Sequence, residues 1–158
     1  EEEYPSVTTL KQEPRMSEAE REDFLASFQE DNPQLLVGFA VMGGIFGEGI
    51  DLTGNRLRGV TIVGVGLPQL CVERDLIRDH FQEENGRGFE YSYIYPGINK
   101  VLQAVGRVIR SETDLGEALL IDTRFQRPEY RDLLPAWWQI QRFSIFETES
   151  RERDLIGL

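Results

Sequence analysis

Apolar residues recur with the period of an α-helix in the stretch that begins near Ile98. The apolar positions follow the spacing of one helix face: Ile98, Val101, Leu102, Val105 and Ile109. The opposite face carries polar residues and one glycine: Asn99, Gln103, Gly106, Arg107 and Arg110. This pattern predicts an amphipathic helix that extends to Arg110 and packs its apolar stripe on a core.

The polar face of this helix is poorly suited to stabilising a helix. Arg107 and Arg110 are three residues apart, where like charges repel, and Gly106 costs about 1 kcal/mol relative to alanine. The same residues suit a helix that brings two guanidinium groups to one polyanion, with Gly106 leaving room for a close approach. The alternative is a surface helix whose C-terminal arginines complement the helix dipole.

Three continuous apolar runs have the composition of strands that are covered on both faces. They span residues 35–41, 59–67 and 116–122, and a shorter β-like segment lies at 7–10. Helices are expected over 17–32, 68–84 and 128–134, the first of which begins with a capping box formed by Ser17 and Glu20. The alternation of strands and helices predicts an α/β fold with a largely parallel sheet.

A glycine-rich segment, residues 43–54, directly follows the first of these apolar runs. Ligands of parallel sheets bind at the carboxyl ends of strands, and glycines there let backbone approach a ligand closely. No Gly-Lys-Ser/Thr follows, so the segment is not a Walker A loop. A glycine-rich turn without a binding role is the alternative.

Two aromatic segments have a structural and a functional interpretation. Aromatic side chains alternate with other residues over 89–95, which predicts a strand or loop that packs its rings on the core. Trp137 and Trp138 are expected to be a pair with one ring in the core and one at its rim. For both segments the alternative is a platform on which nucleic-acid bases stack.

Charge and composition exclude several classes of function. The formal net charge is -11, which argues against a broad basic surface that binds nucleic acid, although a local anion site is compatible with it. Cys71 and His80 are the only cysteine and histidine, so the chain holds no disulfide, and we expect no metal site or cluster in it. Without a signal-peptide pattern or a run of ~18 apolar residues, we expect a cytoplasmic protein that spans no membrane.

Two of these segments resemble conserved motifs of superfamily 2 DNA helicases. Residues 44–51 resemble motif V and residues 103–110 resemble motif VI, in the form found in the DinG/XPD (Rad3-like) branch. Residues 120–125 are similar to the segment that follows motif VI there, and the resemblance covers about 17–138. It implies the second RecA-like motor domain of an ATP-dependent helicase, with a three-layer, P-loop NTPase-like fold.

The resemblance also implies roles for individual residues. Arg107 and Arg110 correspond to arginine fingers that stabilise charge on the γ-phosphate of ATP, and Gln103 corresponds to a sensor of that phosphate. The residues implied in ATP binding and in its coupling to DNA are Gly47, Glu48, Gly49, Asp51 and Gly106. From their position after the third apolar run, we expect Asp122 and Arg124 to support the finger arginines.

The resemblance covers only part of a helicase. We expect 1–142 to be a partial helicase C-terminal domain and 143–158 to be a tail. The first RecA-like domain would bind most of the ATP and Mg²⁺, and the whole protein would act on single-stranded or forked DNA. The chain by itself is therefore expected to be inactive. An iron–sulfur cluster or a nuclease domain upstream is an open alternative within this branch.

Two further expectations concern the strands and the motor itself. In this branch a strand that carries motif IV precedes the first helix, and we expect that strand to be missing and the chain to be N-terminally truncated. A missing strand leaves an exposed sheet edge through which the chain would self-associate. The alternative to a motor is a RecA-like interaction module without catalytic function, against which the intact set of Gln103, Arg107 and Arg110 argues.

Overall fold

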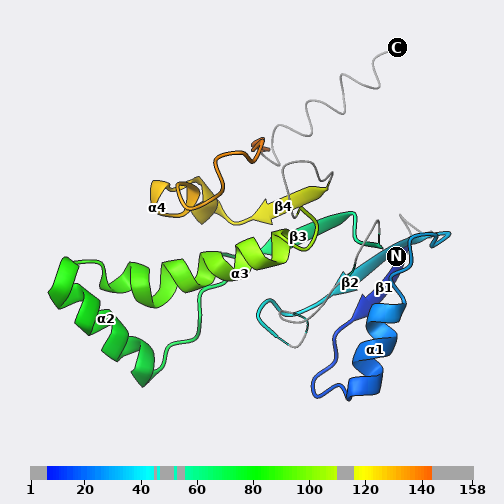
Figure 1. Cartoon of the computed structure of the whole chain (residues 1–158), viewed down its shortest axis with the longest axis horizontal. Helices are drawn as coiled ribbons and strands as arrows, with labels where there is room; N and C mark the ends of the chain where they lie inside the picture. The colour runs from blue at the N-terminus through cyan, green and yellow to red at the C-terminus, as the bar shows by residue number, and fades with distance from the viewer. Residues whose placement is uncertain (1–6, 45, 47–51, 53–55, 110–115, 144–158) are drawn as a thin grey trace, which may run out of the picture.

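A computed structural model describes residues 7–44, 46, 52, 56–109 and 116–143 of the chain. Figure 1 shows the elements. In chain order they are β1 (Val7–Lys11), α1 (Glu18–Ala26), β2 (Leu35–Phe39), β3 (Gly59–Val63), α2 (Val72–Asn85), η2 (Glu90–Ile94), α3 (Tyr95–Val105), β4 (Glu117–Ile121), η3 (Thr123–Gln126) and α4 (Pro128–Arg131).

The described strands form two parallel pairs. β1 pairs with β2, with Val7 opposite Leu35, and β3 pairs with β4, with Gly59 opposite Glu117. The α/β class with parallel strands is confirmed. A strand, β1, stands before the first helix, which confirms the β-like segment predicted at 7–10. The expectation about the strand of motif IV stays a prediction.

The first parallel pair is covered by α1, whose two ends are both closed by side chains. At the N-terminus, the Ser17 hydroxyl accepts the Glu20 N–H and the Glu20 carboxylate accepts the Ser17 N–H at 2.7 Å. This is the capping box that the sequence predicts. Beyond the C-terminus, Arg56 donates to the carbonyls of Phe28 at 2.6 Å and Leu25 at 2.9 Å. Arg56 thereby satisfies acceptors that a helix end leaves unpaired.

The inner face of β2 lies directly against this helix. A Cβ added to Gly38 would come within 2.7 Å of the Phe28 ring and 3.1 Å of the Phe24 ring. The Phe24 ring also stacks on Phe46 with the ring centroids 4.5 Å apart. Phe24, Phe28 and Phe46 are buried together with Leu52 in a cluster that we call the α1 cluster.

The prediction that the strands are covered on both faces is wrong for this chain. Alternate residues point away from the covering helices and are between 47% and 73% exposed: Leu35, Phe39, Val63, Leu119 and Ile121. Their neighbours along each strand are packed against one of the two cores, as in Leu36, Val60, Ile62 and Leu120. Each pair therefore has one covered face and one exposed apolar face, because the described helices pack on one side only.

The segment over 89–95 is helical, so its predicted strand or loop is wrong. It forms η2 and continues without interruption into α3, with Tyr95 donating its N–H to the Glu90 carbonyl in π-helical spacing. Pro96 has no N–H for the Ser92 carbonyl, and Arg74 of α2 donates to that oxygen instead at 3.1 Å. The alternating aromatic pattern did not indicate a strand here, because its rings pack on different partners. Tyr91 stacks on Phe81 of α2 with the ring centroids 4.0 Å apart, whereas Tyr93 is buried.

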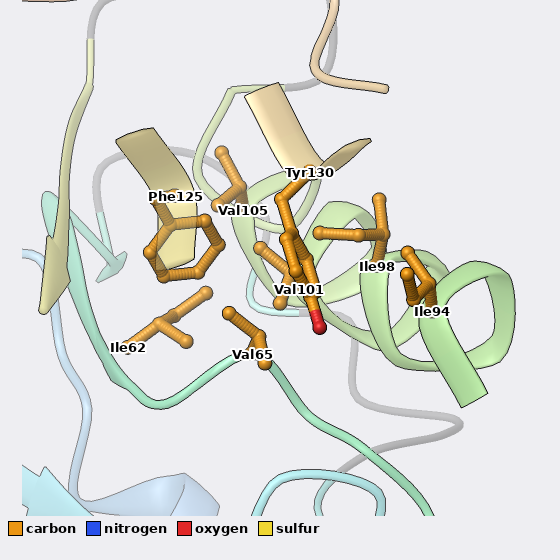
Figure 2. Packing of buried hydrophobic residues seen from close by; sticks show 8 residues of the cluster. All are labelled: Ile62, Val65, Ile94, Ile98, Val101, Val105, Phe125 and Tyr130. Carbon is orange, nitrogen blue, oxygen red and sulfur yellow. The ribbon is translucent and has the colours of Figure 1, made fainter. Parts of the chain in front are cut away.

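The second parallel pair is covered by α3, whose apolar stripe forms the larger core. Figure 2 shows this core, which we call the α3 cluster. Its buried residues are Ile62, Val65, Ile94, Ile98, Val101, Val105, Phe125 and Tyr130. Val101 and Val105 are 0% exposed, which confirms the predicted stripe. Trp138 packs against the same cluster and Trp137 is 44% exposed, as expected of a core and rim pair.

The start of α3 touches the segment after β3 backbone to backbone. A Cβ on Gly97 would lie 2.6 Å from the Val65 carbonyl oxygen, and a Cβ on Gly66, where φ is +68°, would lie 2.8 Å from the Gly97 carbonyl oxygen. No side chain fits between backbones at these separations. The two glycines therefore fix where α3 begins relative to the carboxyl end of β3.

We expect Gly97→Ala to destabilise the chain by about 1–3 kcal/mol, since its methyl group would displace backbone and not a movable side chain. Gly59→Ala is the matched control, because a Cβ there would meet only the Glu117 carbonyl at 3.4 Å, an ordinary contact. Urea unfolding of both variants measures the difference. Equal stability of the two variants would contradict the proposed backbone contact.

Candidate functional site

The segment that resembles motif VI lies where α3 ends. The helix was predicted to reach Arg110, but it ends at Val105. Gly106 donates to the Leu102 carbonyl at 2.8 Å, and the N–H groups of both Val108 and Ile109 turn back to the Val105 carbonyl at 2.9 Å. The chain leaves the helix here because Val108, which is buried, packs directly against Gly116 at the start of β4.

This end of α3 brings two of the three expected catalytic residues together. Gln103 is exposed in the last turn, and Arg107 is half-buried in the turn that follows, with its N–H on the Ala104 carbonyl at 3.3 Å. The two lie four residues apart, so they are neighbours along one side of the helix end. Arg110, the second expected finger, lies outside the described residues.

Gly106 sits between these residues in a conformation that any residue adopts. Its φ is -61° and its ψ is -8°. A Cβ there would meet only carbonyls of its own turn, those of Leu102 at 3.0 Å and Gln103 at 3.7 Å. An alanine would fit after a shift of a few tenths of an ångström. The fold of the described chain therefore gives no strong reason for a glycine at this position.

The segment that resembles motif V follows β2, and the structure describes only its margins. Gly47, Glu48, Gly49 and Asp51 all lie outside the described residues. The nearest described residues on either side, Phe46 and Leu52, are 7% and 8% exposed and belong to the α1 cluster. The two margins of the motif are thus fixed to the same core by apolar packing.

The side chain of Lys100 in α3 lies at the beginning of this segment, beside Gly43. Lys100 was not among the site residues predicted from the sequence. Its side chain runs past Gly43, where φ is +76°: a Cβ on Gly43 would lie 3.2 Å from Cδ, 3.3 Å from Cε and 3.5 Å from Nζ of Lys100. The signal was present in the sequence, because Lys100, Gln103 and Arg107 are spaced i, i+3 and i+7 on one helix face. The contact with Gly43 required the tertiary structure.

Asp122 and Arg124 form a closed pair after β4. Arg124 donates from Nε to one carboxylate oxygen at 2.9 Å and from Nη2 to the other at 2.7 Å, while its backbone N–H caps η3 through the same carboxylate at 2.9 Å. The hydrogen bond from the Arg124 side chain holds the pKa of Asp122 below its usual value, and the same bond raises the pKa of Arg124. Both carboxylate oxygens are therefore already engaged.

This pair does not lie at the same end of β4 as the end of α3. Asp122 directly follows the carboxyl end of β4, whereas Val108 packs on Gly116 at the amino end. Five strand residues span about 16 Å. An effect of the pair on Arg107 would therefore have to pass through packing: Phe125 of η3 is buried in the α3 cluster beside Val105, two residues before Arg107 (Figure 2).

Outside these segments the described chain offers few groups for chemistry. In the described ranges, no group of three or more metal-ligating side chains is placed to hold a metal ion. Cys71 is exposed, and His80 is exposed on α2 with its Nε2 3.7 Å from the Glu84 carboxylate. Within the same part of the chain, no helix has the length and apolar character that crossing a membrane requires.

The Asp122–Arg124 pair predicts a pH dependence of stability. Because the folded state lowers the pKa of Asp122 from about 3.9, the pair contributes fully above that value, and its contribution is lost as the pH falls through the folded pKa. We expect Asp122→Asn to be less stable at pH 7 and to lose less stability than wild type between pH 5 and pH 2. Chemical unfolding at several pH values measures this, with the exposed Asp31→Asn as control; parallel curves for Asp122→Asn and wild type would contradict it.

Comparison with known proteins places this geometry in a family. A family model described as the helicase C-terminal domain matches residues 2–141. A regulator of telomere elongation helicase 1 homolog from Culex quinquefasciatus is 32% identical over 74% of this chain. The ATP-dependent DNA helicase DinG of Photobacterium profundum is 30% identical over 71% of it. The chain spans only 13% and 16%, respectively, of the length of these two relatives.

The fold has a counterpart among solved structures. An XPD helicase superposes with a TM-score of 0.60 and 23% sequence identity, over 78% of this chain and 22% of the other. The α/β arrangement with parallel strands is that of a RecA-like domain. Since the family model covers nearly all of the sequence, the chain belongs to the helicase C-terminal domain family, in its DinG/XPD-like branch of superfamily 2.

Proposed function

We propose that the chain is the second motor domain of an ATP-dependent DNA helicase and completes an ATP site whose other half lies on a first RecA-like domain. The single observation that carries this proposal is the end of α3, where Gln103 and Arg107 flank a glycine that the fold itself does not require. The local fold does not explain this glycine. A glycine beside an arginine leaves room for a phosphate or a partner domain to approach the arginine closely. Both relatives are named as helicases, and the one from Photobacterium profundum as an ATP-dependent DNA helicase, which supports the same function.

In this proposal the chain stabilises negative charge on the γ-phosphate. Arg107 and Arg110 act as arginine fingers, which matter more in the transition state of hydrolysis than in the bound substrate. Gln103 senses the γ-phosphate from the last turn of α3. The first domain binds most of the ATP and Mg²⁺, and Mg²⁺ supplies further charge neutralisation there. Closure of the two domains on ATP and their opening after hydrolysis drives movement along DNA.

The motif V residues have a coupling role in this proposal. Glu48, Gly49 and Asp51, with Gly47, link the nucleotide site to the strand of DNA. Support comes from the margins of this segment, because Phe46 and Leu52 anchor it to the α1 cluster on both sides. A displacement at the nucleotide site therefore has a packed element to act on.

We assign Asp122 and Arg124 a positioning role that acts through η3. The pair closes η3 with three hydrogen bonds, and η3 places Phe125 in the α3 cluster that also holds Val105. Through this packing the pair sets the end of α3, from which Arg107 emerges. We propose this indirect effect in place of a direct contact between the pair and the finger arginines. Asp122 lies at the far end of β4, away from the end of α3.

The alternative function is a RecA-like interaction module that has lost its motor. The exposed apolar faces of both strand pairs favour some partner surface, since side chains such as Val63 and Leu35 are left uncovered. A module of this kind has no use for the polar face of α3. The two functions differ in whether Gly106 and Arg107 affect ATP hydrolysis.

We expect Gly106→Ala to leave the chain folded with stability within about 1 kcal/mol of wild type, because alanine favours a helix end in this conformation. In a protein that carries both motor domains, the same change should lower DNA-stimulated ATP hydrolysis about 100-fold by holding the phosphate away from Arg107. Thermal unfolding and a steady-state ATPase assay read the two effects separately. Normal hydrolysis by a stable variant would remove the main support for the ATP site.

We expect Arg107→Ala to lower ATP turnover of the two-domain protein about 1,000-fold, with a smaller change in KM for ATP, because a finger stabilises the transition state. The control is Arg87→Ala, which removes an exposed arginine in the turn after α2. The 158-residue chain assayed by itself should be silent. An Arg107→Ala protein that hydrolyses ATP normally would favour the interaction module.

A further inference from the structure

Lys100 occupies a place that the proposed ATP site does not use. Its side chain crosses Gly43, the first residue of the glycine-rich segment, and its Nζ passes 3.5 Å from the position of a Cβ there. The glycine is needed for this contact in two ways: its φ of +76° suits glycine, and a side chain would push against the lysine. Gly43 thus fixes the path of the Lys100 side chain beside β2.

The position of Lys100 along α3 separates it from the proposed finger. α3 begins against Val65 and Gly66, at the carboxyl end of β3, and its last turn leads to Gly116, at the amino end of β4. Lys100 lies seven residues before Arg107, which corresponds to about 10 Å along the helix axis. Lys100 lies midway along α3 and beside Gly43, beyond the carboxyl end of β2, whereas Arg107 follows the end of α3 near the amino end of β4.

Lys100 forms no ion pair with a residue that the structure describes. Within the described ranges, no carboxylate lies within ion-pair distance of its ammonium group, whereas Arg78, Arg124 and Arg131 all have such partners. The chain carries 28 acidic against 17 basic residues, so a contact with a polyanion has to depend on local cations of this kind. Lys100 is also one of only two lysines, with Lys11.

We propose that Lys100 contacts a backbone phosphate of the DNA strand at the carboxyl edge of β2. This inference rests on the proposed function, which supplies the DNA. An ammonium group on a flexible stem binds phosphate as a point charge without reading base sequence. Held over Gly43, it also joins the DNA to the beginning of the motif V segment, while Gln103 and Arg107 on the same face of α3 serve the nucleotide.

The test measures binding of a labelled oligo-dT strand to the two-domain protein at several salt concentrations. Loss of one phosphate contact to a single strand lowers the slope of log K against log salt by about 0.7, which is about a fivefold loss of affinity at 0.1 M salt. We expect this from Lys100→Gln, recovery with Lys100→Arg, and no change with Arg87→Gln, a control that removes an exposed charge in the turn after α2. KM for ATP at saturating DNA should stay unchanged.

A second measurement needs no variant. Acetylation of surface lysines in wild type, followed by peptide mapping, should show that oligo-dT protects Lys100 from the reagent. A Lys100→Gln protein with the wild-type salt slope, or with raised KM for ATP and unchanged DNA binding, overturns this inference and leaves the proposed function intact. Wild-type protein that binds no oligo-dT and hydrolyses no ATP overturns both.

Discussion

Burial of one face of α3 against β3 and β4 is the constraint on which the candidate site depends. Val101 and Val105 are fully buried in this contact, and Ile98 is nearly so. Once this face is fixed, the rotation of the helix about its axis is fixed, and the polar face can present Lys100, Gln103 and Arg107 only outward. Apolar packing thus orients the polar groups.

The axial position of α3 is set by two contacts at its ends. Close backbone contact between Gly97 and Gly66 holds its start, and packing of Val108 on Gly116 turns the chain toward β4. A helix fixed at both ends cannot slide, so a group near its start and a group past its end keep a constant separation. The roles proposed for Lys100 and Arg107 depend on this constant separation.

Several polar side chains of this chain form hydrogen bonds with backbone groups at helix ends and before a proline. The capping box of α1, Arg56 beyond the other end of α1, Arg74 on the Ser92 carbonyl and Asp122 at η3 each satisfy backbone groups that a helix end or a proline leaves unpaired. Apolar faces, in contrast, remain exposed on β2, β3 and β4. In the described chain, backbone groups are thus satisfied locally, while apolar strand faces stay exposed.

The sequence by itself determined the α/β class, the parallel strands, the capping box of α1 and the apolar stripe of α3, because these depend on local periodicity and capping chemistry. Alternation over 89–95 was misleading, since Pro96 and the partner helix α2 decide between strand and helix there. Only the tertiary structure decided that α3 ends at Val105, where Val108 packs on Gly116, and that Lys100 crosses Gly43. Each of these is a contact between segments brought together by the fold, and residue spacing along one chain carries no information about such contacts.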